Sequence, residues 1–403
     1  MKKLTSILTV LLFAVLFSAG ARAADGDLFV QVDNGNTDED EDECSILKVD
    51  PDGDLSQFIS PTEIEAVTGL DSNSCENTGL AIDMAGNVFF SLDHVSVINF
   101  DPFETFNTSS ILMATPDGTL SQFVSPAQLL AAIPGAAEVD LENGMAFGPD
   151  GALYVNDSES NSILRIPVPL GPITRVVTES DIAALLGPGP NIDLDSGISV
   201  DQFGNIYFAN DDSNNDRDNV IFKYSSAGGL SILTTQQQII NATGEIAIDL
   251  DVGMVLKGIL YVMDDGDCDC VLAVIPTNGQ VKEFITEDQI TDATGEDGAD
   301  LEGGIAADNR GNLYLGDNED DQPNIVLVKN AKTSIFVSDT EIENFYSDLG
   351  IDFAPEYNGS MAVEGVKEKV AQIPTLSEWG LIAMALALGV IGFVVIRKRA
   401  VKA

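Results

Sequence analysis

The sequence predicts an all-β fold, a six-bladed β-propeller with short helices between the blades. A unit of four short apolar strands recurs six times between residues 28 and 366, and each unit ends in a capped helix start. The glycines that open the inner strands are Gly79, Gly144, Gly197, Gly253, Gly304 and Gly359, spaced 51 to 65 residues apart. Repetition at such a period is typical of stacked or radial units, and four strands per unit indicate a propeller blade.

The third unit illustrates how the strands are assigned. Residues 144–147 predict a short buried inner strand, 149–151 a turn, and 152–156 a second strand. Residues 163–166 and 174–177 predict the third and fourth strands. All four are short β-rich runs bounded by Gly, Pro, Asn or Asp, which is the pattern of strands joined by tight turns.

Each fourth strand leads into the same helix-start pattern. The predicted N-caps are Ser60, Ser125, Thr178, Thr235, Thr286 and Ser338, and three residues on come Glu63, Gln128, Asp181, Gln238, Gln289 and Glu341. This arrangement is a capping box, and in five of the six units an apolar pair brackets it as a hydrophobic staple. Glycines such as Gly69 and Gly244 follow at the position where a C-cap ends a helix.

The two ends of the repeat predict how the ring closes. The first unit begins at Leu28 with a second strand and lacks an inner strand, whereas residues 359–365 form an inner strand with no successor. The C-terminal strand should therefore complete the first blade and remove the open edge. We expect one propeller domain over residues 24–366, followed by a linker over 367–372.

The N-terminus predicts export. Residues 1–23 combine a basic start, an apolar run over 4–17 and an Ala21-Arg22-Ala23 cleavage site, which together indicate a secretory signal peptide. Near the C-terminus, residues 379–396 are long and apolar enough to span a membrane, and a basic cluster follows them. Basic residues stay cytoplasmic, so the body should lie outside the inner membrane.

A short motif precedes the apolar span. Its residues are Ile373, Pro374, Thr375, Leu376, Trp379 and Gly380. With the helix and basic tail of residues 373–403, this motif resembles the IPTL-type C-terminal sorting signal of Gram-negative bacteria. The resemblance implies an exosortase-family processing protease as a partner, a membrane-anchored precursor, and delivery to the cell surface or extracellular matrix. The alternative is a plain membrane anchor.

The charge of the exported body narrows its partners. Residues 24–372 contain 12 Lys and Arg against 64 Asp and Glu, a net charge of about −52. Nucleic acid is excluded as a partner, because binding it requires Lys and Arg to neutralise phosphates. Divalent cations, basic partners and a saline solvent remain compatible with this charge. A surface with charge of one sign also favours solubility.

Four cysteines in an exported protein should be oxidised. Cys44 and Cys75 fall in loops on one rim of neighbouring blades, which predicts a bridge between them. Cys268 and Cys270 are separated by a single residue. They are expected to form a small strained disulfide, to pair between chains, or to stay reduced, because sequence alone does not define the pairing.

Carboxylates are predicted to surround the mouth of the central channel. Four units carry an Asp-Leu-acid pattern before the inner strand, and acids also end the second strands. The candidate metal ligands are Glu142, Asp195, Asp251 and Glu302 from the first set and Asp157, Asp211, Asp264 and Asp317 from the second. Like charges this close favour a counter-ion such as Ca²⁺. The alternatives are acids that cap backbone N–H groups and, for runs such as 264–269, solvated loops.

The residues 304–308 and 311–317 (GIAAD and GNLYLGD) carry a further resemblance. They are similar to the NHL and SMP-30/gluconolactonase-like group of six-bladed propellers, although the arginine typical of NHL repeats is absent. The SMP-30 resemblance implies a metal-dependent lactonase-type hydrolase as an alternative function. His94 is the only histidine, and we predict no catalytic residue. The favoured prediction is a binding or structural module, stabilised by calcium, for a polysaccharide or protein ligand.

Overall fold

The computed structural model describes residues 26–35, 44–69, 78–93, 95–100, 103–107, 109–142, 144–188, 191–211, 219–318, 322–349, 354–356 and 360–364. All of these belong to one compact unit of residues 24–365, and the chain ends over 1–23 and 366–403 are grouped apart from it. The predicted signal peptide, linker, sorting motif and transmembrane helix lie outside the described residues, as does His94.

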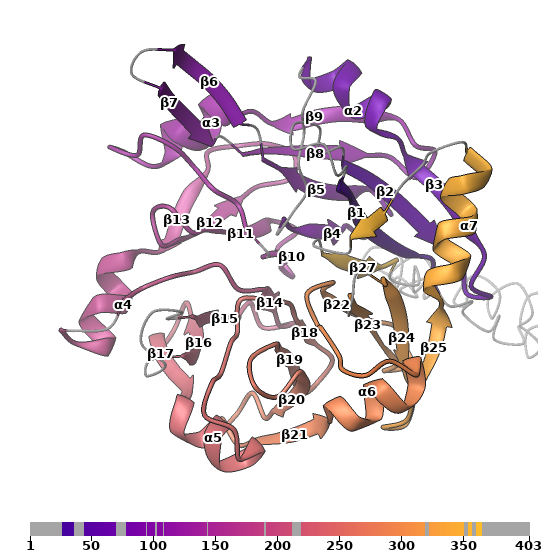
Figure 1. Cartoon of the computed structure of the whole chain (residues 1–403). Helices are drawn as coiled ribbons and strands as arrows, with labels where there is room; N and C mark the ends of the chain where they lie inside the picture. The colour runs from indigo at the N-terminus through magenta and orange to yellow at the C-terminus, as the bar shows by residue number, and fades with distance from the viewer. Residues whose placement is uncertain are drawn as a thin grey trace, which may run out of the picture. The chain divides into compact units, whose positions relative to one another are not determined.

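Six antiparallel sheets form a ring, which confirms the predicted six-bladed propeller (Figure 1). The strands from blade one to blade six are β1 (Leu28–Gly35), β2 (Cys44–Val49) and β3 (Leu55–Ile59); β4 (Leu80–Ile82), β5 (Val88–Leu92), β8 (Ser110–Ala114) and β9 (Leu120–Val124); β10 (Met145–Phe147), β11 (Leu153–Asp157), β12 (Ser162–Ile166) and β13 (Thr174–Val177); β14 (Ile198–Val200), β15 (Ile206–Asn210), β16 (Val220–Ser225) and β17 (Gly229–Thr234); β18 (Met254–Leu256), β19 (Leu260–Asp264), β20 (Cys270–Val274) and β21 (Val281–Ile285); β22 (Ile305–Ala307), β23 (Leu313–Asp317), β24 (Asn324–Val328) and β25 (Thr333–Val337). Blade two also carries a separate hairpin of β6 (Val95–Phe100) and β7 (Phe103–Asn107).

Two C-terminal strands complete blade one. The inner strand β27 (Met361–Val363) pairs antiparallel with the start of β1, with Leu28 opposite Val363. This confirms that the C-terminal strand closes the ring. A further strand, β26 (Ala354–Glu356), pairs with the far end of β1 and was not predicted.

The glycines that open the inner strands are explained by close approach around the channel. A Cβ atom at Gly79 would lie 2.8 Å from the Cβ of Met145 in the next blade, and one at Gly253 would lie 2.9 Å from the backbone nitrogen of Ile305. Real Cβ contacts this short essentially never occur. A side chain at these positions would therefore push neighbouring inner strands apart.

The core is divided into layers, each between two neighbouring blades. The second strands are almost wholly buried because both faces contact another blade, and β5, β11, β15 and β23 are buried along their full length. Where the ring closes, Tyr346 packs among residues of blades one and six, and its hydroxyl lies 3.2 Å from the Ser45 hydroxyl. Burial of apolar side chains at each such layer is the main force that holds the blades together.

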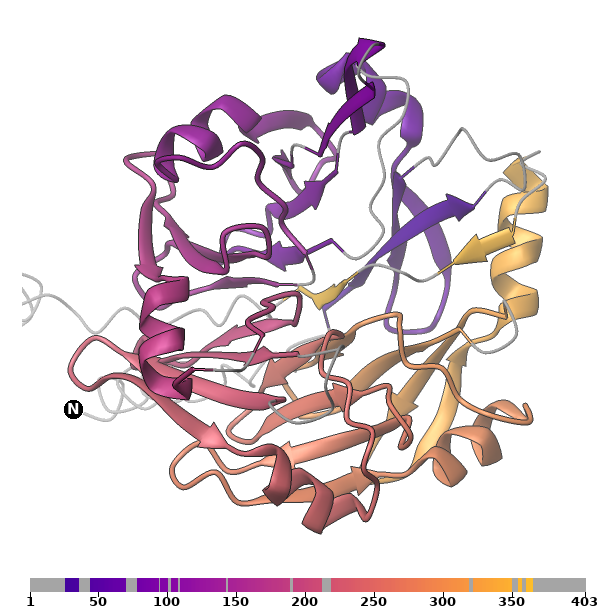
Figure 2. The same ribbon diagram turned by 60° about the vertical axis from the view of Figure 1, so that its left-hand side comes forward.

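A short helix follows the fourth strand of every blade and lies at the outer edge of the ring (Figures 1 and 2). The helices are α2 (Pro61–Thr68), α3 (Pro126–Ala132), α4 (Glu179–Leu186), α5 (Gln236–Thr243), α6 (Glu287–Thr294) and α7 (Asp339–Leu349). The predicted capping boxes are present; in α2, for example, Ser60 N donates to Glu63 Oε2 at 2.9 Å. No helix of the described residues is both long and apolar enough to cross a membrane.

The propeller has two faces with different chain segments. The mouth face holds the ends of the second strands, the loops before the inner strands, and the helices. The turn face holds the turns that join inner to second strands and third to fourth strands. The alternating direction of antiparallel neighbours within each blade assigns every loop to one of these two faces.

Candidate cation site at the channel mouth

The loops before the inner strands of blades three to six share a buried anchor. The leucine of each Asp-Leu-acid pattern is at most 2% exposed; these residues are Leu141, Leu194, Leu250 and Leu301. Side chains of an extended segment alternate in direction, so burial of the leucine turns both flanking acids the other way. The repeated pattern thereby places pairs of acids at the mouth of the channel.

Three of the predicted ligands from second-strand ends are also backbone caps. Asp157, Asp264 and Asp317 each accept a hydrogen bond from the N–H of the first acid of their own blade's pattern, at 3.0, 3.0 and 2.9 Å. One oxygen of each carboxylate is therefore engaged in holding the loop. This is the capping arrangement that the sequence left open beside the metal prediction.

Blade four departs from this pattern. Asn210, rather than an acid, accepts the bond from Asp193 N at 3.0 Å. The following residue, Asp211, is almost fully buried and accepts from Leu250 N of the next blade at 3.5 Å. The predicted ligand Asp211 thus links two blades.

Several carboxylate oxygens at the mouth are buried without a hydrogen-bond donor. They are Asp140 Oδ1, Asp195 Oδ1, Asp264 Oδ2 and Asp317 Oδ2. A buried acceptor left in this state costs about 1–3 kcal/mol, and more when it is charged. These oxygens are consequently places where a proton or a cation would be stabilising.

Two groups of three carboxylates come together between blades five and six. One consists of Asp249, Asp251 and Asp265, and the other of Asp265, Asp300 and Glu302. Within each group, one oxygen from every residue lies within 4.8 Å of the others. Asp265 belongs to both groups, so five carboxylates form a continuous cluster, which we call the Asp265 cluster.

Burial and mutual repulsion raise the pKa of these carboxyls. Burial, and then the charges of Asp265 and Asp249, raise the pKa of Asp251 to about 9. Burial and the charge of Asp249 raise the pKa of Asp265 to about 7. On the neighbouring blade, burial and the charge of Asp193 raise the pKa of Asp195 to about 8. Around neutral pH these carboxyls retain protons unless a cation compensates their charge.

The structure brings together only part of the predicted ligand set. Of the eight candidates, Asp251 and Glu302 enter the Asp265 cluster. Glu142 and Asp195 lie at the mouth, and burial and the charge of Asp140 raise the pKa of Glu142 to about 7, but neither belongs to a group of three among the described residues. As metal ligands, all eight stay predictions.

Asp265 was missed at the sequence level. It belongs to the acidic run 264–269, for which the sequence favours a solvated loop and in which Asp264 alone is a predicted ligand. It follows Asp264, the last residue of β19, and its N–H donates to Asp249 O at 3.3 Å. An acid one residue beyond a second strand, opposite an Asp-Leu-acid loop, is the signal that would have identified it.

The cysteines of the described residues are oxidised. Cys268 and Cys270 form a disulfide, which decides among the three alternatives that the sequence left open. Cys44 is also disulfide-bonded, while its predicted partner Cys75 lies outside the described residues.

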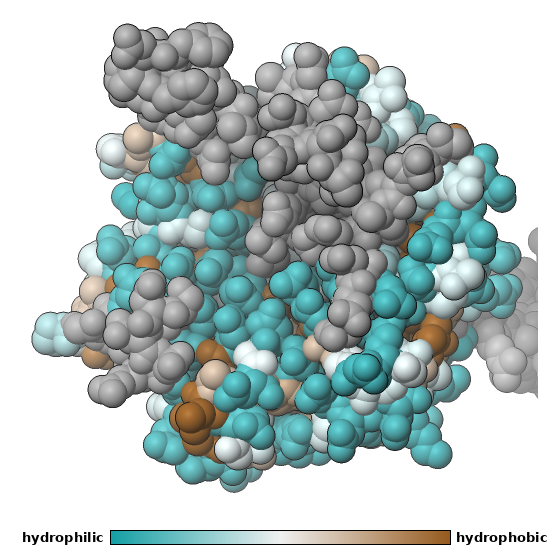
Figure 3. All heavy atoms as spheres, in the orientation of Figure 1, coloured by the Kyte–Doolittle hydropathy of each residue, from teal (hydrophilic) through white to brown (hydrophobic). Residues whose placement is uncertain are grey.

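Charges are segregated between the two faces. The nine lysines and arginines of the described propeller are Lys48, Arg165, Arg175, Lys223, Lys257, Lys282, Arg310, Lys329 and Lys332. Every one lies in a turn, or in the half of a strand, next to the turn face. Within the described ranges the mouth face carries acids and no base, and hydrophilic residues dominate the surface seen in Figure 3.

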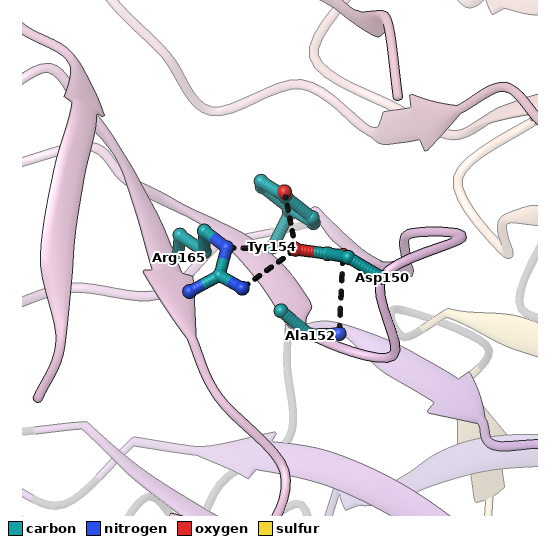
Figure 4. A network of polar contacts seen from close by, with 4 residues as sticks. All are labelled: Asp150, Ala152, Tyr154 and Arg165. Carbon is teal, nitrogen blue, oxygen red and sulfur yellow. Dashed lines mark hydrogen bonds and ion pairs between the residues drawn. The ribbon is translucent and has the colours of Figure 1, made fainter. Parts of the chain in front are cut away.

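On the turn face, aspartates are compensated by built-in donors. Asp150 accepts from Ala152 N at 3.2 Å and from Arg165 Nη2 at 2.6 Å, with the Tyr154 hydroxyl 3.3 Å away (Figure 4). Partial burial acts against ionisation here, but the hydrogen bond and charge of Arg165 outweigh it and lower the pKa of Asp150. This carboxylate needs no added cation.

The C-terminal segment has a clear counterpart among known motifs. Residues 371–400 match the IPTL-CTERM motif. The chain ends in a sorting signal. This confirms the resemblance drawn from residues 373–380, and it indicates an exported protein.

Solved structures give similarity of fold alone. The chain is similar to the crystal structure of a nidogen/laminin complex (13% identity, TM-score 0.49, covering 84% of this chain and 100% of that one). It is also similar to virginiamycin B lyase from Staphylococcus aureus (16%, 0.42, 77% and 88%) and to the calcium-binding protein regucalcin from Agrobacterium tumefaciens (13%, 0.34, 58% and 66%). Curated proteins gave no match. At these identities and TM-scores the similarities carry no argument about activity.

Proposed function

We propose that this chain is an exported, surface-delivered propeller whose channel mouth binds a divalent cation, with Ca²⁺ the favoured ion. In this proposal the cation stabilises the propeller, and the protein acts as a binding or structural module rather than an enzyme. The acidic mouth then presents bound calcium and the surrounding carboxylates to a polysaccharide or protein ligand.

The Asp265 cluster is the observation that carries the proposal. Its five side chains offer oxygen atoms alone, which is the donor type that Ca²⁺ prefers. Asp265 and Asp251 both have raised pKa values, so each gains from a nearby positive charge. Within the described part of the mouth face no lysine or arginine is present to supply that charge, which supports a cation from solution.

A thermal melt tests the proposal directly. The full-length protein in detergent is heated with millimolar Ca²⁺, with Mg²⁺, and with chelator, at constant ionic strength. Binding to the folded state alone adds about 2.7 kcal/mol at a ligand concentration of one hundred times Kd. We expect a calcium-specific rise in the midpoint. An unchanged midpoint would exclude the cation site.

A pair of matched variants locates the site. Asp265→Asn removes the carboxylate common to both groups and should abolish the calcium shift. Asp297→Asn makes the same substitution at an exposed residue outside the Asp265 cluster and should keep the shift. Equal shifts in both variants would show that calcium acts through general screening.

A lactone screen separates the module from the lactonase-type alternative. The calcium-loaded protein and its Asp265→Asn variant are incubated with aliphatic lactones, and released acid is titrated. We expect no hydrolysis above the buffer rate. Hydrolysis lost in the Asp265→Asn variant would establish the enzyme instead.

For the C-terminal motif, we infer recognition by an exosortase-family membrane protease. Cleavage near residues 373–380 would remove the apolar segment and its basic tail from the mature protein. The mass of the protein recovered from the cell surface tests this. A mature chain that retains residues 381–403 would indicate a plain membrane anchor.

A further inference from the structure

We propose that the Cys268–Cys270 disulfide is a thiol–disulfide exchange site for a small cationic thiol. The two cysteines lie in the loop between β19 and β20 of blade five. They differ in accessibility: Cys268 is 7% exposed and borders a surface cleft, whereas Cys270, the first residue of β20, is 0% exposed and does not line the cleft. This asymmetry makes Cys268 the sulfur that an incoming thiol attacks and Cys270 the leaving sulfur.

The cleft beside Cys268 selects for size and charge. It has a volume of about 260 Å³, which is below the usual range of about 300–1,000 Å³ for drug-sized ligands. Its acidic lining consists of Glu245, Asp267, Glu283, Glu287 and Asp288, and no lysine or arginine borders it. A small thiol with a positive charge is concentrated there, and an anionic thiol is repelled.

The loop does not depend on the disulfide for its position. Asp267 N donates to Ala247 O at 3.1 Å, and Asp265 N donates to Asp249 O. A Cβ atom at Gly266 would lie 2.5 Å from Ala247 O, so the loop also packs closely on this segment. In the chain-entropy account a disulfide stabilises more when it closes a longer loop, and this one closes the shortest loop that leaves a residue between the cysteines. By constraining the unfolded chain, this disulfide therefore adds little to the free energy of unfolding.

A buried acceptor beside the sulfurs favours the reduced form. A carboxylate oxygen of Asp264 lies within 4.8 Å of both Sγ atoms. Asp264 Oδ1 accepts from the N–H groups of Asp249 and Gly266, whereas Oδ2 is buried without a donor. Reduction would create S–H donors beside this carboxylate, whereas the disulfide has none. This difference favours the dithiol form.

The exchange balances with the thiol as the only co-reactant. The first thiol attacks Cys268 Sγ, the Cys268–Cys270 bond breaks, and the displaced proton ends on Cys270. A second small thiol then attacks the mixed disulfide at the sulfur of the first small thiol. This step releases Cys268 as a thiol. Two thiols are oxidised to one disulfide, and the protein disulfide is reduced to a dithiol.

Reduction of the native protein by three small thiols tests the proposal. The full-length oxidised protein is treated with cysteamine (cationic), 2-mercaptoethanol (neutral) and 2-mercaptoethanesulfonate (anionic) at equal thiolate concentrations. Released thiols are alkylated and located by peptide mass. We expect cysteamine to open Cys268–Cys270 about tenfold or more faster than the anionic thiol at low salt. The difference should shrink at 1 M salt, where the Debye length falls to about 3 Å.

Equal rates for the three thiols, or a bond that opens only on unfolding, would overturn the proposal. A Lys-Cys-Lys peptide forms a fourth arm, and a rate above that of cysteamine would replace the small thiol with a basic peptide as the partner. Asp288→Asn, in the cleft wall, should lower the ratio of the reduction rate with cysteamine to the rate with the anionic thiol. Asp292→Asn, on the same helix but outside the cleft, should leave this ratio unchanged.

Single-cysteine variants test the assigned order of attack. In Cys270→Ser the remaining Cys268 thiol should form a mixed disulfide with cystamine. In Cys268→Ser the buried Cys270 should react at least about tenfold more slowly, because thiol reactivity depends on access. Equal reactivity of the two variants would contradict the order, and the thiol series on the unmodified protein remains decisive if either variant fails to fold.

Discussion

The two faces of the propeller use the same residue in opposite ways. On the turn face, Asp201 accepts from the N–H groups of Phe203 and Asn205, both at 2.8 Å, and from the Asn205 side chain. Partial burial acts to raise its pKa, but these hydrogen bonds outweigh burial and lower it. At the mouth, burial and neighbouring carboxylates instead raise the pKa of Asp195 and Asp251.

The difference lies in what compensates each charge. A turn-face aspartate is surrounded by donors that the chain itself supplies within a few residues, so its charge stabilises the turn. A mouth aspartate faces other acids from adjoining blades, so its charge destabilises the fold until a proton or cation arrives. Local sequence therefore determines the role of a turn aspartate, whereas ring closure determines the role of a mouth aspartate.

The largest expected effect is an inverted dependence of stability on pH. Between the ordinary carboxyl pKa of about 4 and the raised values of about 7 to 9, the folded chain holds protons that the unfolded chain has released. The free energy of unfolding consequently falls as pH rises through this window. In chelator, we expect a lower thermal midpoint at pH 8.5 than at pH 5, by about 2–4 °C for each 1 kcal/mol lost.

Calcium provides the control for this pH profile. Millimolar Ca²⁺ should restore the midpoint at pH 8.5 and have little effect at pH 5, where protons already compensate the mouth. If the thermal midpoint in chelator at pH 8.5 equals or exceeds the midpoint at pH 5, the mouth carboxylates do not destabilise the fold when they ionise. The two faces would then not differ in how their charges are compensated.

One substitution made on each face should affect stability differently, with a loss on the turn face and no loss at the mouth. Asp195→Asn removes a buried charge whose Oδ1 has no donor, so in chelator at pH 8 the midpoint should stay constant or rise. Asp201→Asn weakens charge-assisted hydrogen bonds in the turn before β15, and we expect a loss of about 1 kcal/mol. Denaturant unfolding of both variants measures the difference. Equal losses of unfolding free energy would mean that Asp195 acts as a stabilising hydrogen-bond acceptor rather than as an uncompensated charge.

The smallest effect is expected at the turn-face ion pair of Figure 4. Arg165 and Asp150 are about one-third exposed, at 32% and 40%. Exposed pairs of this kind contribute about 0.2–1 kcal/mol, so Arg165→Ala should lower the free energy of unfolding within that range. Salt should reduce the effect further. A loss above 2 kcal/mol would show that turn-face compensation extends beyond the pair.

The blades were predictable because their determinants are local and repeated. A three-residue apolar run, a Gly-Asn or Asp-Gly turn and a Ser or Thr cap act over a few residues, and six copies reinforce one another. Ring closure by β27 was also predictable. The last inner strand has no blade of its own, and the first blade has no inner strand, so the two were expected to pair. Strand β26 was missed because it extends β1 beyond the repeated register.

The candidate site was predictable only in outline. The repeated Asp-Leu-acid loops placed acids at the mouth, but which acids meet depends on contacts between blades. The Asp265 carboxylate lies near acids of its own blade (Asp249 and Asp251) and near acids of the next blade (Asp300 and Glu302). Contacts between blades are tertiary, so the sequence identified Asp264 as a candidate ligand and not Asp265.

Closure by β27 also has a consequence for the order of events during export. Among the described residues Met361–Val363 form the last strand, and their partner β1 is the first. The Glu364 N–H donates to Asp27 O at 2.8 Å, so the seam joins the earliest and latest parts of the body. A polypeptide that emerges from its N-terminus can assemble blades two to six in turn, but blade one stays incomplete until residues 361–363 are available to pair with β1. The last step of folding therefore depends on a segment that is made only after the other blades are complete.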